Sequence, residues 1–265
     1  MAAVRFRLFC YFRLFIFSLS SHSSEYIRYE DSRVSMACTY SIVAYADNAL
    51  PIAQYVNEAF DEIDRIDRLM SHYKPDSPLS NLNRNAAHQA VRVDDELFDF
   101  ITECVRYSRL SDGAFDITVG PLMKAWGFFR GEGRMPRADE LRHARASIGY
   151  QHIILDEQAK TIRFARPGLS LDLGGIAKGY AVDRAVALLK RRGIRDALVN
   201  AGGSTIYGLG SDATLGIGKG WAVQVRDPFD ERKTALTVQL KDKINRTYAI
   251  DTFLDGINGI YKIIL

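Results

Sequence analysis

The stretch LDLGGIAKGYAVD, from Leu171 to Asp183, places an acid, two adjacent glycines and a lysine at the start of a predicted helix. Gly174 and Gly175 precede that helix, so their N–H groups can face an anion at the positive end of the helix dipole. Lys178 adds a mobile positive charge that suits a phosphate, and Asp172 ends an apolar run at the mouth of a strand. A plain strand–turn–helix, with glycines for close packing and a solvated lysine, fits the same residues. The segment alone leaves both interpretations open.

Common cofactor and metal motifs do not decide between these two interpretations. The segment matches neither the GxxxxGK[ST] spacing of a P-loop nor the GxGxxG of a dinucleotide-binding turn. The chain contains no CxxC, HExxH or GxSxG motif, and its five histidines form no ligand-spaced cluster. Its three cysteines are far apart and suit buried apolar positions better than a disulfide framework or a zinc site.

The composition and the order of the predicted helices and strands indicate the fold class. The chain has 265 residues, of which 47% are hydrophobic, enough for the core of one large domain or two small ones. Helical and strand patterns mix without a regular βαβ order, which favours an α+β fold. The formal net charge is only +3, with both signs interspersed, so we expect no nucleic-acid partner.

Periodicity and turn residues predict most of the elements. Asp94 or Asp95 can cap the second helix, and Gly113 can end it. The polar segment 71–86, SHYKPDSPLSNLNRNA, is predicted to be a structured loop because of its prolines, serines and asparagines. The predicted strands are 39–46, a hairpin over 152–165, a strand through ALVNA, 221–225 and 234–240; the predicted helices are 52–71, 93–113 and one after Gly175 that stops at Gly193.

Two further segments carry candidate chemistry. In GAFDITVGPLMKAWGF, residues 113–128, Asp116 lies between apolar residues, where a buried carboxylate needs hydrogen bonds or a ligand. Asp116 can instead cap a local turn with the help of Thr118. Tyr73, in the polar loop, offers a stacking surface for a flat ring, or else anchors the loop as a half-buried side chain.

Taken in order, these blocks resemble the FAD:protein FMN transferase (ApbE-like) family. The resemblance covers about residues 34–243 and rests on SMACTY, EIDRIDRLMSHYKPDSPLSNLNRN, GAFDITVGPLMKAWGF, LDLGGIAKGYAVD and ALVNAGG. It implies an α+β fold of mixed sheets and packed helices, with the FAD site between the parts. The implied FAD-binding residues are Met36, Tyr73, Ala114, Phe115, Asp116, Asp172 and Lys178, and the Gly175 carbonyl is the implied magnesium ligand.

The resemblance also implies an activity. Family members split FAD at its pyrophosphate with Mg²⁺, attach FMN through a phosphoester to a Ser or Thr of an acceptor protein, and release AMP. Positioning and charge neutralisation can supply most of such catalysis. The implied location is periplasmic or at most membrane-associated.

The sequence departs from the family pattern in three places. The early MGT block reads Met36-Ala37-Cys38-Thr39, and Ser204 follows the glycine pair after ALVN where an acid or amide is common. The His-x-x-Asp-Pro-x-Thr-Gly segment, and the later Asp and Thr that complete the metal site, are not found after Lys243. We therefore expect a flavin transferase domain over 34–243 that is truncated or frame-shifted near residue 243 and followed by a divergent tail, 244–265.

The remaining expectations concern the N-terminus and the competing functions. Residues 1–33 are interpreted as a signal-like or non-native extension, because Arg13 interrupts the apolar run and no cleavage site follows. Three outcomes stay open: a flavin transferase of weak or absent activity, a catalytically inactive flavin-binding protein, and a degraded product that folds poorly.

Overall fold

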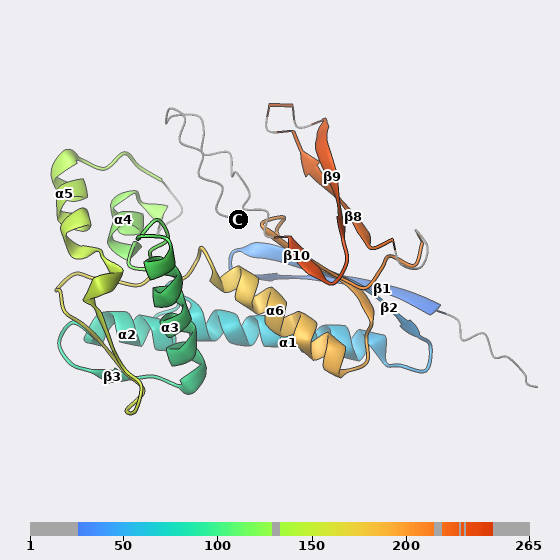
Figure 1. The fold of residues 1–265 in the computed structure, drawn as a ribbon, viewed down its shortest axis with the longest axis horizontal. Coiled ribbons are helices and arrows are strands. Elements are labelled where there is room, and N and C mark those ends of the chain that lie inside the picture. Colours follow the sequence, from blue (N-terminus) through green and yellow to red (C-terminus); the bar gives the residue numbers. More distant parts are fainter. Residues whose placement is uncertain (1–25, 129–132, 215–218, 228, 231, 246–265) are drawn as a thin grey trace, which may run out of the picture.

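A five-stranded antiparallel sheet forms the centre of the molecule (Figure 1). The computed structural model describes residues 26–245 except 129–132, 215–218, 228 and 231. The sheet order is β1-β2-β6-β7-β10, and every neighbouring pair is antiparallel. The strands are β1 (Tyr26–Ser35), β2 (Cys38–Asp47), β6 (Asp196–Ala201), β7 (Thr205–Leu209) and β10 (Lys243–Asn245).

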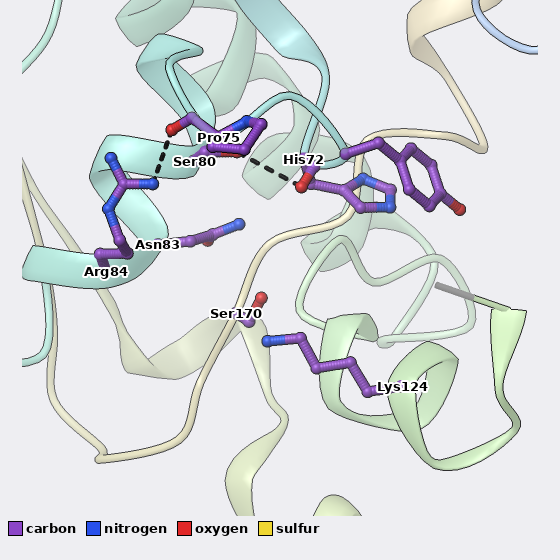
Figure 2. Close-up of a pocket in the computed structure, with 8 residues that line it drawn as sticks. His72, Pro75, Ser80, Asn83, Arg84, Lys124 and Ser170 are labelled. Carbon is purple, nitrogen blue, oxygen red and sulfur yellow. Dashed lines mark hydrogen bonds between the residues drawn. The ribbon is translucent and has the colours of Figure 1, made fainter. Parts of the chain in front are cut away.

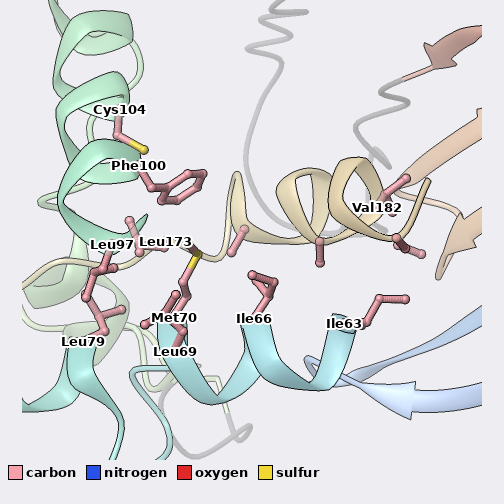
Figure 3. Close-up of a cluster of buried hydrophobic side chains, with 14 of the residues drawn as sticks. Ile63, Ile66, Leu69, Met70, Leu79, Leu97, Phe100, Cys104, Leu173 and Val182 are labelled. Carbon is pink, nitrogen blue, oxygen red and sulfur yellow. The ribbon is translucent and has the colours of Figure 1, made fainter. Parts of the chain in front are cut away.

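Two long helices, α1 (Ile52–Met70) and α6 (Ala177–Arg191), pack against each other and on one face of this sheet (Figure 1). Each buries an apolar stripe at helical spacing, for example Val56, Ile63 and Ile66 on α1. On their outer side, Arg184 Nε donates to Glu62 Oε1 at 2.9 Å. The buried side chains of α1 continue without a break into the helices beyond the sheet (Figure 3).

A second group of elements lies beyond the end of α1 (Figure 1). Its three-stranded sheet has the order β3-β5-β4, and a short 3₁₀ turn, Tyr150–His152, precedes β4. The group contains α2 (Pro78–Asn85), β3 (Val91–Arg92), α3 (Asp95–Leu110), α4 (Gly120–Ala125), α5 (Ala138–Ser147), β4 (Ile153–Asp156) and β5 (Thr161–Phe164). Figure 3 shows Leu79, Leu97 and Phe100 of this group meeting Met70, so the two groups share one core.

A hairpin of β8 (Trp221–Arg226) and β9 (Thr234–Leu240) covers the other face of the central sheet. Trp221 and Leu240 pack there against Tyr45 and Ile206. The hairpin buries part of this second face, while alternate positions on β1 and β6 stay exposed or half-buried.

The predicted α+β class and most predicted elements are confirmed. The loop prediction for 71–86 was partly wrong, because residues 78–85 form α2. The sequence Ser77-Pro78 is a typical helix start that the loop prediction did not take into account. The Ser77 hydroxyl accepts from the Ser80 N–H at 2.9 Å, and Pro78 is the first residue of the helix.

The central sheet extends across both expected domain limits. β1 begins at Tyr26, upstream of the expected limit at 34, because its ten residues pair with β2 throughout. At the other end, β10 reaches Asn245 and pairs with β7, so the sheet includes the start of the expected tail. Residues 1–25 and 246–265, with most of both expected extensions, lie outside the described residues. Among the described residues, no helix has the length and apolar character needed to cross a membrane.

Candidate functional site

The two blocks around Asp116 and Asp172 lie side by side. The Asp172 N–H donates to the Ile117 carbonyl at 2.8 Å, and the Gly120 N–H donates to the Ser170 carbonyl at 3.2 Å. Val119 and Ser170 form a parallel bridge between these hydrogen bonds. A Cβ at position 120 would lie 2.6 Å from the Ser170 carbonyl oxygen, so only glycine permits this approach.

Asn83 on α2 fixes the same segment from the other side. Its Nδ2 donates to the Leu171 carbonyl at 2.9 Å, and its Oδ1 accepts from the Leu171 N–H at 2.7 Å. One side chain thereby replaces a strand partner for Leu171. The segment that carries Asp172 is held between α2 and the Ile117–Gly120 segment.

Asp172 is buried, with its carboxylate turned into the glycine turn. Its side chain is 5% exposed, and Oδ1 accepts from the Gly174 N–H at 2.8 Å. Among the described residues, no donor makes a hydrogen bond to Oδ2. The His72 Nε2 atom lies 3.5 Å from this oxygen, beyond the usual range for a hydrogen bond. Asp172 Oδ2 can therefore accept a hydrogen bond from a ligand.

The helix after this turn has the features of an anion site. α6 starts at Ala177 without a side-chain cap or an acidic residue in its first turn, and it carries Lys178 there. The Ala177 N–H donates to the Leu173 carbonyl at 2.8 Å, so the helix dipole and the lysine are the features that favour a negative group here. Gly174 and Gly175 are exposed at the same place, so this positive end of the helix opens to solvent.

A pocket of about 270 Å³ lies between α2 and α4 (Figure 2), and Tyr73 is one of the residues that line it. Tyr73 is 51% exposed, and its ring contacts the His72 ring at a centroid distance of 3.9 Å. Burial raises the pKa of Tyr73, and the nearby Asp172 carboxylate raises it further. The lining residues are His72, Tyr73, Pro75, Ser80, Asn83, Arg84, Lys124 and Ser170.

Both carboxylate oxygens of Asp116, unlike those of Asp172, accept hydrogen bonds from the protein. Oδ1 accepts from the Thr118 N–H at 2.8 Å and from the Thr118 hydroxyl at 2.7 Å. Oδ2 accepts from the Tyr150 N–H at 2.9 Å. Asp116 therefore caps its own turn with the help of Thr118, as the turn-capping alternative expects. Nearby, Ala114 is exposed, and Phe115 packs on the core.

Met36 and Lys178 belong to a second group of predicted site residues. Met36 and Ala37 form the two-residue turn between β1 and β2, at φ values of 47° and 57°, and the Tyr40 hydroxyl donates to Met36 Sδ at 3.1 Å. Cys38 follows the turn; burial raises the pKa of its thiol, while the Lys178 charge lowers it. Lys178 therefore lies within electrostatic reach of this turn.

The positive φ at Ala37 bears on the first departure expected from the sequence. Ala37 adopts a left-handed conformation at φ 57°. Glycine has no steric penalty there, whereas alanine does. This chain keeps the turn at some cost in conformational energy.

Gly175 is the residue predicted to offer its carbonyl to magnesium. Its main chain is exposed, and a Cβ at this residue would meet no atom within 4 Å, so its surroundings are open to an ion and water. No group of three or more His, Cys, Asp or Glu side chains in the described part of the chain could hold a metal ion. The described residues thus do not form a magnesium site by themselves.

Sequence reasoning missed two residues of this region, His72 and Asn83. His72 is buried with Asp172 although it lies in a polar loop, and its place directly before Tyr73 was the available signal. Asn83, in the segment expected to be a loop, is the clamp on Leu171. Only the three-dimensional pairing shows either role.

Comparison with known proteins gives a consistent result. The model of the ApbE family matches residues 36–248. The FAD:protein FMN transferase of Escherichia coli K12 is 32% identical over 181 residues, which are 67% of this chain and 50% of that protein. The Vibrio cholerae protein of the same name is 30% identical over 230 residues, which are 84% of this chain and 65% of that protein.

Solved structures agree with the sequence matches. The ApbE protein of Thermotoga maritima aligns with a TM-score of 0.75 at 26% identity, over 82% of this chain and 69% of that one. The flavin transferase ApbE of Vibrio cholerae aligns with a TM-score of 0.72 at 28% identity, over 82% of this chain and 70% of that one. The chain spans about half the length of the E. coli relative it matches. By its sequence, its fold and the order of its site blocks, the chain belongs to the ApbE family.

Proposed function

We propose that this chain binds FAD and transfers its FMN half to a Ser or Thr of an acceptor protein, with release of AMP. The observation that carries the proposal is the junction of Ile117–Gly120 with Ser170–Asp172. It joins the Asp116 block to the glycine turn, next to the Tyr73 pocket. The similar proteins of Escherichia coli K12 and Vibrio cholerae are named FAD:protein FMN transferase.

The residues of the chain have distinct roles in this proposal. The start of α6 and Lys178 face the pyrophosphate, where a helix N-terminus and an ammonium group offset negative charge. Tyr73 offers an exposed ring for stacking. Asp172 accepts a hydrogen bond from the nucleotide through Oδ2, and Met36, Ala114, Phe115 and Asp116 contact FAD from the flanking turns.

Magnesium enters the proposal through one atom of the described residues, the Gly175 carbonyl. The bound ion would neutralise charge on the pyrophosphate as it splits. The side chains described here provide no complete ligand set, so we assign no step of the reaction to the ion. The proposed location is periplasmic or membrane-associated, an expectation from the family resemblance in the sequence alone.

One incubation tests the proposed transfer. The full chain is mixed with FAD, Mg²⁺ and an acceptor that carries a Ser or Thr target, and the acceptor is assayed for covalent flavin fluorescence and the solution for AMP. Labelled acceptor together with AMP supports the proposal. FAD bound without labelling would reduce the function to flavin binding, and absence of FAD binding by a folded chain would refute the assignment.

A further inference from the structure

His72 occupies a position for which the family resemblance assigns no role. Its side chain is 5% exposed, as is that of Asp172, and the two approach through Nε2 and Oδ2 at 3.5 Å. Its ring also contacts the Tyr73 ring at 3.9 Å between centroids. The His72 imidazole thus lies against Asp172 and Tyr73, two of the residues proposed to bind FAD.

The surroundings of His72 favour its neutral form. Burial lowers the pKa of His72, and the Lys124 charge lowers it further, while the Asp172 carboxylate raises it. Tyr73, whose ring contacts that of His72, is neutral at physiological pH, and its pKa is raised further by burial and by Asp172. A neutral imidazole carries one ring N–H, and its tautomer follows the acceptor that is nearest.

The main chain at His72 is held in place. The Ser80 hydroxyl of α2 lies 3.3 Å from both the Ser71 and the His72 carbonyl oxygens, to which it can donate (Figure 2). The ring therefore projects from a fixed loop onto the wall of the pocket. Only a small movement is needed to shorten the 3.5 Å separation into a hydrogen bond.

We infer that His72 is a positioning residue, whose neutral Nε2–H form donates to Asp172 Oδ2 and holds both that carboxylate and the Tyr73 ring for FAD. The choice of FAD as the ligand rests on the proposed function. The contact between His72 and Asp172 does not. With Oδ1 on the Gly174 N–H and Oδ2 facing His72, the carboxylate has one orientation. Without the imidazole, Asp172 would lie in a buried space with one oxygen unsupported, which is unfavourable.

Three variants of the full chain distinguish a hydrogen bond from His72 to Asp172 from a role of the His72 side chain as filling volume alone. His72→Leu keeps the volume but removes the donor, and we expect FAD affinity to fall about tenfold or more. His72→Gln places an N–H near the position of Nε2, and we expect affinity within about threefold of the original. His72→Asn is too short to reach Oδ2 and should behave like His72→Leu. The matched control is His88→Leu, at an exposed histidine, which should leave affinity unchanged.

A measurement without flavin tests the geometry independently. In protein labelled with ¹⁵N-histidine, NMR should show the His72 proton on Nε2 near neutral pH, and Asp172→Asn should weaken that preference. A proton on Nδ1 would overturn the inference, as would wild-type FAD affinity in a folded His72→Leu variant. If the leucine variant does not fold, the comparison of Gln with Asn decides. If the original chain binds no FAD, the proposed function fails, and the NMR result alone decides the role of His72.

Discussion

The two aspartates of the site region differ in how much of each carboxylate the protein itself uses. Asp116 receives three hydrogen bonds, two from Thr118 and one from the Tyr150 N–H. Asp172 receives one, from Gly174, and its other oxygen faces His72 at 3.5 Å. A carboxylate whose oxygens are bonded within the protein stabilises the fold, whereas Asp172 Oδ2 keeps an acceptor position for a ligand beside His72. The difference predicts stability effects at Asp116 and binding effects at Asp172.

The largest expected effect comes from breaking the junction that joins the two regions. Gly120→Ala would place a Cβ 2.6 Å from the Ser170 carbonyl oxygen, and neither backbone segment can move without losing hydrogen bonds. We expect a loss of about 3 kcal/mol in the free energy of unfolding and loss of FAD binding with it. Urea unfolding measures the first, and Gly175→Ala is the control for this stability measurement, because its Cβ meets no atom within 4 Å and its φ is not positive. Equal stability of Gly120→Ala and the original chain would contradict the described junction.

Removing the Asp116 carboxylate should be the next largest change. Asp116→Ala leaves the Tyr150 N–H and the Thr118 groups without their acceptor, so we expect a loss of about 2 kcal/mol in unfolding free energy. The exposed Asp76 provides the control, and Asp76→Ala should stay within about 0.5 kcal/mol. Unchanged stability of Asp116→Ala would show that its hydrogen bonds are replaceable.

Asp172→Asn should weaken FAD binding and leave the stability of the fold nearly unchanged. The amide can keep the bond from Gly174 through its oxygen and removes a buried negative charge, so we expect unfolding free energy within about 1 kcal/mol of the original. FAD affinity should fall at least about tenfold, which corresponds to about 1.4 kcal/mol of binding free energy. Flavin fluorescence titration and thermal melting of the same samples measure the two effects. A loss of stability without a loss of affinity would remove the contrast with Asp116.

The smallest expected effect concerns the β1–β2 turn in the second group of site residues. Ala37→Gly relieves a left-handed alanine at φ 57°, and we expect a gain of about 1 kcal/mol in unfolding free energy. FAD affinity should change little, because Met36 and Lys178 are retained. Destabilisation by Ala37→Gly would indicate that the turn does not adopt this conformation in solution.

The extent of successful sequence prediction follows from the range of the interactions. α1 and α6 were predictable because their apolar stripes and end residues are local signals. α2 was missed because proline and polar residues dominate its segment, although Ser77 and Pro78 mark a helix start. The roles of Asn83 and His72 depend on contacts 88 and 100 residues along the chain, with Leu171 and Asp172. No local pattern reports such pairings, nor which oxygens of Asp116 are already bonded.

The most direct test of the account maps FAD onto the protein by NMR. FAD is titrated into the full ¹⁵N-labelled chain, and amide shifts are followed residue by residue. We predict saturable shifts with one dissociation constant, largest at Tyr73, Gly174, Gly175 and Lys178, while the Tyr150 amide keeps its hydrogen bond to Asp116. Saturable shifts confined to the β8–β9 hairpin, with none at Gly174, would contradict the account.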